Sequence, residues 1–180
     1  MKRAGDKGIF EWALHDIRKH AVDEYGHVDD TLYGGGTGML MLAEPLYRSW
    51  QDAVAAGGER AKSRRRTIYL SPKGRTFTQD IAREYADCDQ LILICGHYEG
   101  VDQRLIDEIV DEELSIGDYV LTGGELAALV VLDGTSRMLE GVLPDKSAYE
   151  NESHFEGRLE ARQYTRPPEW HGRTVPPVLM

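Results

Sequence analysis

Cysteine is scarce in this chain of 180 residues, which contains only Cys88 and Cys95. The two do not form a CxxC pair and lie in no cluster of cysteine and histidine. The sequence therefore predicts neither a disulfide framework nor a zinc site. Cys95 ends an apolar run, and we interpret it as a small buried residue rather than a nucleophile.

Long apolar runs are also lacking. No run approaches the roughly 18 residues needed to span a bilayer, and no cationic segment is followed by an apolar stretch and a cleavage site. These absences predict a cytoplasmic protein. The length fits one domain with a substantial core.

Basic residues are outnumbered, with 21 lysines and arginines against 31 aspartates and glutamates, for a net charge of −10 at pH 7. Such a charge is unexpected for a protein that grips a phosphate backbone. The three-arginine run Arg64–Arg66 has two interpretations, an RNA phosphate contact or a solvated loop. A charge run this short is more often a solvated loop.

The apolar pattern indicates strands alternating with helices. Alternation of Phe10, Trp12 and Leu14 with polar or small residues is typical of a half-buried strand. The predicted strands are 10–14, 67–70 and 91–94, and the predicted helices are 44–56, 78–86 and a well-buried 124–139. This order predicts an α/β fold with a parallel sheet covered on both faces.

Two glycine-punctuated segments, Cys95–Asp102 and Ser115–Leu126, carry most of the functional information. Each touches a strand-like apolar run, 91–94 before the first and 119–121 inside the second. Ligands bind at strand ends in open parallel sheets, and glycine lets backbone approach a ligand closely. The pair favours a backbone-lined pocket for an adenosine-like ligand. Each segment alone could also be a set of tight turns.

A third glycine segment, Tyr33–Gly38, is not followed by Gly-Lys-Ser/Thr, so an ATP-binding P-loop is disfavoured. It is interpreted either as a base-positioning loop or as a surface loop. No strand is followed by G-x-G-x-x-G, which weakens the hypothesis of a dinucleotide-binding oxidoreductase.

Several motifs agree in order with one known family. Across essentially the whole chain, the sequence resembles the bacterial tRNA (guanine-N1)-methyltransferases of the TrmD family in Asp29-Asp30, Tyr33–Met39, Tyr69–Arg75, the two glycine segments, Tyr164–Pro167 and Val175–Leu179. Ordered motifs are far more specific than one glycine pattern. The resemblance implies a SPOUT-type parallel sheet flanked by helices, with a deep trefoil knot in the C-terminal part.

The resemblance also implies an activity, the methylation of N1 of the guanosine just 3′ of the tRNA anticodon. The implied cofactor is S-adenosyl-L-methionine, and magnesium is allowed as an aid to catalysis. The implied partners are tRNA and a second copy of the chain, because family members are homodimers whose active site uses both subunits. The residues that the match places around the cofactor are Tyr69, Leu70, Gly96, Tyr98, Glu99, Gly100, Ile116, Gly117, Tyr119, Leu121, Gly123 and Gly124.

Methylating guanine N1 requires its proton to leave while negative charge gathers on O6, so a carboxylate and a cation are needed. Arg137 matches the family arginine that faces O6, or else complements the macrodipole of its helix. Glu152, followed by Ser153, stands where the family usually has the aspartate base, or else is one exposed acid among several. Glu99 is expected to bind the ribose hydroxyls, unless it is an exposed loop acid, and His97 is assigned no catalytic role.

Family members begin with a buried strand ahead of the first helix and continue into a C-terminal domain that holds the tRNA. The expectation is therefore that residues 1–180 are a SPOUT core shortened at both ends, with weakened tRNA binding. Two functions stay open, the active methyltransferase and a catalytically impaired dimeric core that still binds S-adenosylmethionine.

Overall fold

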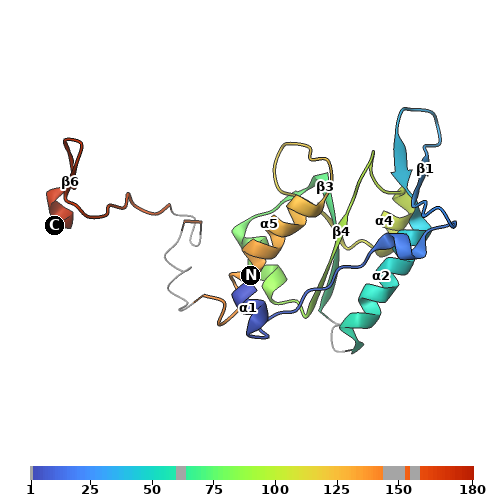
Figure 1. Ribbon diagram of the computed structural model, residues 1–180, viewed down its shortest axis with the longest axis horizontal. Helices are drawn as coiled ribbons and strands as arrows, with labels where there is room; N and C mark the ends of the chain where they lie inside the picture. The colour runs from blue at the N-terminus through green and yellow to red at the C-terminus, as the bar shows by residue number, and fades with distance from the viewer. Residues whose placement is uncertain (1, 60–63, 144–152, 155–158) are drawn as a thin grey trace.

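A computed structural model describes residues 2–59, 64–143, 153–154 and 159–180. At its centre is a three-stranded sheet with the order β4-β3-β5 (Figure 1). Both pairings are parallel, and the strands are β3 (Arg65–Thr76), β4 (Gln90–Cys95) and β5 (Glu112–Ser115). The register of β3 against β5 shifts between Leu70 and Arg75. The predicted α/β class and parallel sheet are confirmed.

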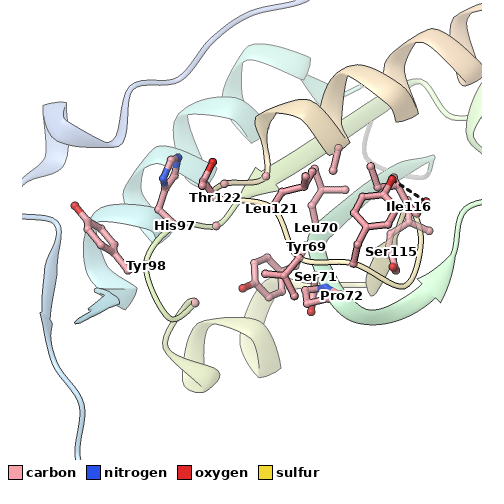
Figure 2. Close-up of a pocket in the computed structure, with 18 of the residues that line it drawn as sticks. Tyr69, Leu70, Ser71, Pro72, His97, Tyr98, Ser115, Ile116, Leu121 and Thr122 are labelled. Carbon is pink, nitrogen blue, oxygen red and sulfur yellow. Dashed lines mark hydrogen bonds between the residues drawn. The ribbon is translucent and has the colours of Figure 1, made fainter. Parts of the chain in front are cut away.

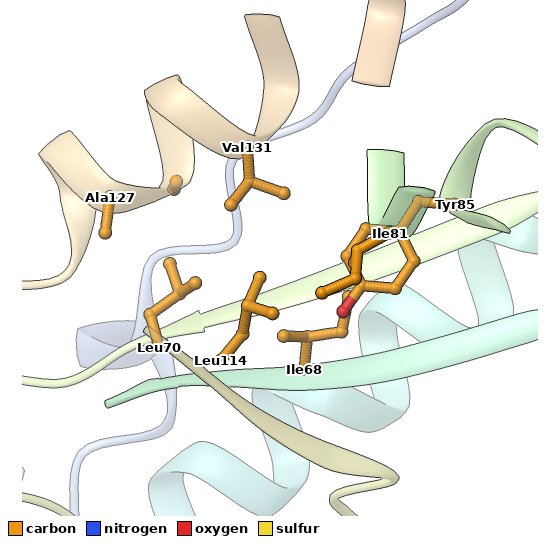
Figure 3. Close-up of a cluster of buried hydrophobic side chains, with 8 residues drawn as sticks. Ile68, Leu70, Ile81, Tyr85, Leu114, Ala127 and Val131 are labelled. Atoms are coloured by element: carbon orange, nitrogen blue, oxygen red, sulfur yellow. The ribbon is translucent and has the colours of Figure 1, made fainter. Parts of the chain in front are cut away.

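Two helices, α3 (Gln79–Ala86) and α5 (Glu125–Ser136), cover one face of this sheet (Figure 3). Thr78 begins α3 as its N-cap, with its hydroxyl accepting a hydrogen bond from the Ile81 amide. The apolar core on this face consists of Ile68, Leu70, Ile81, Tyr85, Leu114, Ala127, Ala128 and Val131.

The opposite face is covered by α2 (Ala43–Gly57) and α4 (Gln103–Ile109). Pro45 lies in the first turn of α2, and the helix ends at Gly57, followed by Gly58 with a φ of 64°. The core on this side consists of Met41, Leu46, Tyr69, Ile94, Val101, Leu105 and Ile109. The sheet is thus covered on both faces, as predicted.

The smaller elements lie outside the sheet. A short antiparallel pair of strands, β1 and β2, precedes α2, and β2 also meets the sheet region through a parallel bridge between Met41 and Val101. A second antiparallel pair, β6 and β7, lies near the C-terminus. The bounds are α1 (Lys2–Asp6), η1 (Ile17–His20), β1 (Asp29–Thr31), β2 (Met39–Met41), β6 (Glu169–Trp170), β7 (Arg173–Thr174) and η3 (Pro177–Leu179).

The predicted helices 44–56 and 78–86 and the predicted strands 67–70 and 91–94 are confirmed, with β3 extending well beyond its predicted end. The predicted strand 10–14 is wrong, because Trp12 and Leu14 are 69% and 86% exposed and the segment joins no sheet. The strand-like run 119–121 is not a strand either. Residues 119–121 form a loop, and the strand that ends at this loop is β5, whose only large apolar residue is Leu114.

The helix predicted over 124–139 exists as α5, but it is not buried all round. Ala127, Ala128 and Val131 pack against the sheet, whereas Leu126, Leu129 and Val130 are 61%, 50% and 47% exposed. The sequence is apolar on every side of this helix, so composition could not separate the buried face from the exposed one.

The C-terminal residues from 159 onward include the β6–β7 hairpin and η3, which Figure 1 draws away from the sheet. The trefoil knot stays a prediction. No helix within the described ranges is long and apolar enough to cross a membrane.

Candidate active site

A pocket of about 220 Å³ opens beside the carboxyl ends of β4 and β5, against residues 69–72 in the middle of β3. Its walls come from β3, the loop between β4 and α4, and the loop between β5 and α5. In Figure 2, Tyr69 and Pro72 lie on one side of the pocket, and Leu121 and Thr122 lie on the other. This edge is where ligands bind in open α/β sheets.

Tyr69 contributes a buried aromatic wall. Its side chain is only 8% exposed, and burial raises the pKa of its phenol, with a smaller contribution from Glu113. The ring lies so close to the first glycine loop that a Cβ on Gly96 would be 3.0 Å from the Tyr69 hydroxyl oxygen. The absence of a side chain at Gly96 therefore lets this loop lie over the tyrosine ring.

Ser115 fixes the turn that opens the second loop. Its hydroxyl accepts a hydrogen bond from the Gly117 amide at 3.1 Å and donates one to the Gly117 carbonyl at 3.0 Å. Gly117 has a φ of 149°, and a Cβ there would be 2.6 Å from the ring of Tyr119. The loop conformation thus requires glycine at this position.

The two loops meet directly at the start of α5. The Gly124 amide donates a hydrogen bond to the Gly96 carbonyl at 3.0 Å. A Cβ on Gly124 would lie 2.7 Å from the Cα of Cys95 and 3.1 Å from the Gly96 nitrogen. Only glycine allows the backbones to approach this closely, and their separation sets the width of the pocket.

The first loop is strained at Tyr98, which has a φ of 57° and is 53% exposed. Such a φ is uncommon for an aromatic residue, and positions of this kind cluster at functional sites. The next residue, Glu99, connects the pocket to the third glycine segment. Its amide donates to the Met39 carbonyl at 3.0 Å, and its side chain lies against Gly38, which has a φ of 104°.

Two titratable groups at the pocket have identifiable electrostatic environments. The imidazole of His97 contacts the carboxylate of Glu125, and this hydrogen bond lowers the pKa of Glu125. Burial raises the pKa of the Cys95 thiol to about 11. At neutral pH Cys95 is therefore a protonated thiol packed against the core, which agrees with its interpretation as a structural residue.

All the residues predicted to surround the cofactor line this one pocket: Tyr69, Leu70, Gly96, Tyr98, Glu99, Gly100, Ile116, Gly117, Tyr119, Leu121, Gly123 and Gly124. Their binding role stays a prediction. Sequence reasoning missed other lining residues, namely Ser71, Pro72, His97, Leu114, Ser115, Val120, Thr122 and Ala127. Most of them interleave with the predicted positions, so taking the loops as continuous segments would have found them.

Arg137, one of the two predicted catalytic residues, does not line this pocket. Arg137 lies at the opposite end of α5 as its C-cap, and Ala127 is the residue of α5 that lines the pocket. Over those ten residues a helix advances roughly 15 Å, more than an arginine side chain can span. Glu152 lies outside the described residues.

A magnesium site is not evident among the residues that the structure describes. Within the described part of the chain, no three or more histidine, cysteine, aspartate or glutamate side chains are grouped so as to hold a metal ion.

Comparison with known proteins decides the family. The profile of the family described as tRNA (Guanine-1)-methyltransferase TrmD matches residues 1–180. The chain belongs to this family. A tRNA (guanine-N(1)-)-methyltransferase of Chloroflexus aurantiacus is 52% identical, over 100% of this chain and 69% of the relative. The corresponding proteins of Dehalococcoides mccartyi and Ruminiclostridium cellulolyticum are 49% and 47% identical, over 100% and 99% of this chain and 71% and 75% of each relative.

The activity follows from membership and from this degree of identity along the whole chain. The protein is a tRNA (guanine-N1)-methyltransferase, its substrate is tRNA, and the family uses S-adenosylmethionine as methyl donor. The chain spans about seven tenths of the length of these relatives.

Proposed function

We propose that the pocket holds S-adenosylmethionine and that the chain methylates N1 of the guanosine just 3′ of the tRNA anticodon, in the cytoplasm where this substrate is found. The observation that carries the proposal is the convergence of three separate segments, which contribute five glycines, on one pocket. Glycine positions that no other residue could occupy without displacing a neighbour, such as Gly117 and Gly124, support it.

The lining fits the chemistry of an adenosine group. Peptide N–H and C=O groups of the loop from Ile116 to Gly124 are suited to the adenine edge, and Ile116 and Leu121 supply apolar walls. The Glu99 carboxylate can accept hydrogen bonds from both ribose hydroxyls. When bound, S-adenosylmethionine supplies a methyl group activated by its sulfonium.

The side chains then act on guanine. The carboxylate of Glu152 would accept the proton that leaves guanine N1 when N1 is methylated. The guanidinium of Arg137 stabilises the charge that develops on O6. The segment Tyr33–Gly38, joined to the pocket through Glu99 and Met39, positions the base.

Arg137 is too far along α5 to serve the pocket of its own chain, so the complete site needs a second subunit. Leu126, Leu129 and Val130 offer an exposed apolar surface on the same helix, which begins at the pocket. A homodimer that covers this surface would bring Arg137 of one protomer toward the pocket of the other. The SPOUT assignment, with one core domain over residues 1–180 and a trefoil knot, is part of the proposal.

Calorimetry with S-adenosylmethionine tests the site. We expect saturable binding by the unaltered chain and none by Gly117→Val, because the valine side chain would fill the loop against Tyr119. Gly5→Ala is the control, since the nearest atom to a Cβ at Gly5 is the Phe10 carbonyl oxygen at 4.0 Å. No saturable binding at millimolar ligand would contradict the proposal. Binding without methyl transfer would favour a core that has kept the cofactor but lost catalysis.

A further inference from the structure

One side-chain contact connects the two loops of the pocket. Nε2 of His97, in the first loop, is in hydrogen-bond contact with Oε1 of Glu125, the first residue of α5. The residues are 28 apart in sequence, and their side chains are 45% and 59% exposed. The contact therefore joins the two loops at the solvent-exposed surface.

The backbone at Gly123, next to this contact, leaves no room for a side chain. A Cβ on Gly123 would lie 2.5 Å from Oε2 of Glu125 and 2.7 Å from Cε1 of His97. The hydrogen bond from Gly124 to Gly96 runs alongside. The end of the second loop is therefore held to the first loop by one backbone contact and one side-chain contact.

Comparable exposed pairs elsewhere lack this placement. His27 and Asp23 form a similar imidazole–carboxylate pair, but they are four residues apart and neither belongs to the loops of the pocket, whereas His97 lines the pocket and Glu125 directly follows the lining residue Gly124. Exposed pairs of this kind contribute little to overall stability. A contact that joins the two loops has a different consequence. It favours the conformation in which the loops lie at the separation seen in this structure.

We propose that His97 and Glu125 are positioning residues that hold the two loops at the separation required by the bound cofactor. This proposal rests on the proposed function of the pocket. Neither side chain is assigned contact with the reacting atoms. The other titratable groups of the first loop, Cys95, Tyr98, Glu99 and Asp102, take no part in this contact.

The contact is exposed, so its expected effect on affinity is moderate. We expect His97→Ala and Glu125→Ala each to raise the dissociation constant for S-adenosylmethionine by about three- to fivefold. The double variant should be no weaker than the weaker single variant, because the second substitution removes nothing further. Glu125→Gln keeps an acceptor oxygen for a neutral or charged imidazole and should restore the dissociation constant to within about twofold.

The test is calorimetry of S-adenosylmethionine binding to the unaltered chain, the four variants and the control Asp23→Ala, which removes the matched pair outside the pocket. The proposal predicts non-additive single effects, rescue by Glu125→Gln and an unchanged control. Unchanged affinity in both single alanine variants, or effects that multiply in the double variant, would overturn it while leaving the proposed function intact. Absence of binding by the unaltered chain would overturn the proposed function and this proposal together.

Discussion

Replacing Gly124 with alanine tests whether the close approach of the two loops shapes the pocket. Gly124 has φ −78° and ψ −8°, which alanine adopts without backbone strain, so the effect isolates the added methyl group. Its Cβ would lie 2.7 Å from the Cα of Cys95, where ordinary contact begins at 3.4 Å. Because both partners are backbone, the loops must separate by about 0.7 Å.

Two costs follow from this displacement. Inserting a methyl group into a packed region typically costs about 1–3 kcal/mol. The hydrogen bond from Gly124 to Gly96, now 3.0 Å long, would stretch beyond bonding distance, which removes about 1 kcal/mol. A free pocket can relax by widening, whereas a bound cofactor needs the original width, so much of the cost falls on binding. We expect the dissociation constant for S-adenosylmethionine to rise at least about tenfold.

Isothermal calorimetry measures this change directly, with circular dichroism confirming that the variant folds. Gly5→Ala serves as the matched control, because its added methyl group has room, and its affinity should stay within about twofold of the unaltered chain. A change of less than twofold for Gly124→Ala would refute the reasoning that loop separation controls binding.

Three further results are expected. Arg137→Ala and Glu152→Gln should each reduce turnover on tRNA by roughly 100-fold, measured by methyl transfer, while the affinity for the cofactor, measured by calorimetry, changes only a few-fold. Equal losses of turnover and of cofactor affinity would contradict an action on the transition state. Light scattering should report twice the 20.3 kDa chain mass, and a strict monomer at tens of micromolar would argue against the shared site. Asp102 caps α4, and the hydrogen bond that it accepts from the Arg104 guanidinium lowers the pKa of Asp102. The ionised Asp102 therefore stabilises the fold at neutral pH, and this contribution is lost as the pH falls below the ordinary aspartate pKa. Denaturant titration should therefore find Asp102→Ala less stable by about 1 kcal/mol at pH 7, with the difference shrinking in acid; a constant difference would contradict this assignment.

Much of the fold could be predicted because its main elements have strong local signals. Thr78 and Gly57 mark helix ends by their side-chain and backbone preferences, and the apolar runs of β3 and β4 are long enough to identify as buried strands. The segment 10–14 failed because alternation shows only which side chains share a face. Pairing also needs a neighbouring strand, and no local pattern specifies one.

The pocket could be predicted because its residues are continuous loop segments with unusual glycine content. What the sequence could not show is how the loops touch. The contact between His97 and Glu125 and the approach of Gly124 to Cys95 depend on tertiary packing across many residues. The far position of Arg137 could have been predicted, because a helix that begins at the second glycine segment carries Arg137 roughly 15 Å away from that segment.

The most direct measurement is nucleoside analysis of unmodified tRNA after incubation with the chain and S-adenosylmethionine carrying a labelled methyl group. Labelled 1-methylguanosine is predicted at the guanosine just 3′ of the anticodon, with none formed by Gly117→Val. Label in another nucleoside, label at another guanosine, or equal transfer by Gly117→Val would contradict the assignment of this pocket to guanine-N1 methylation.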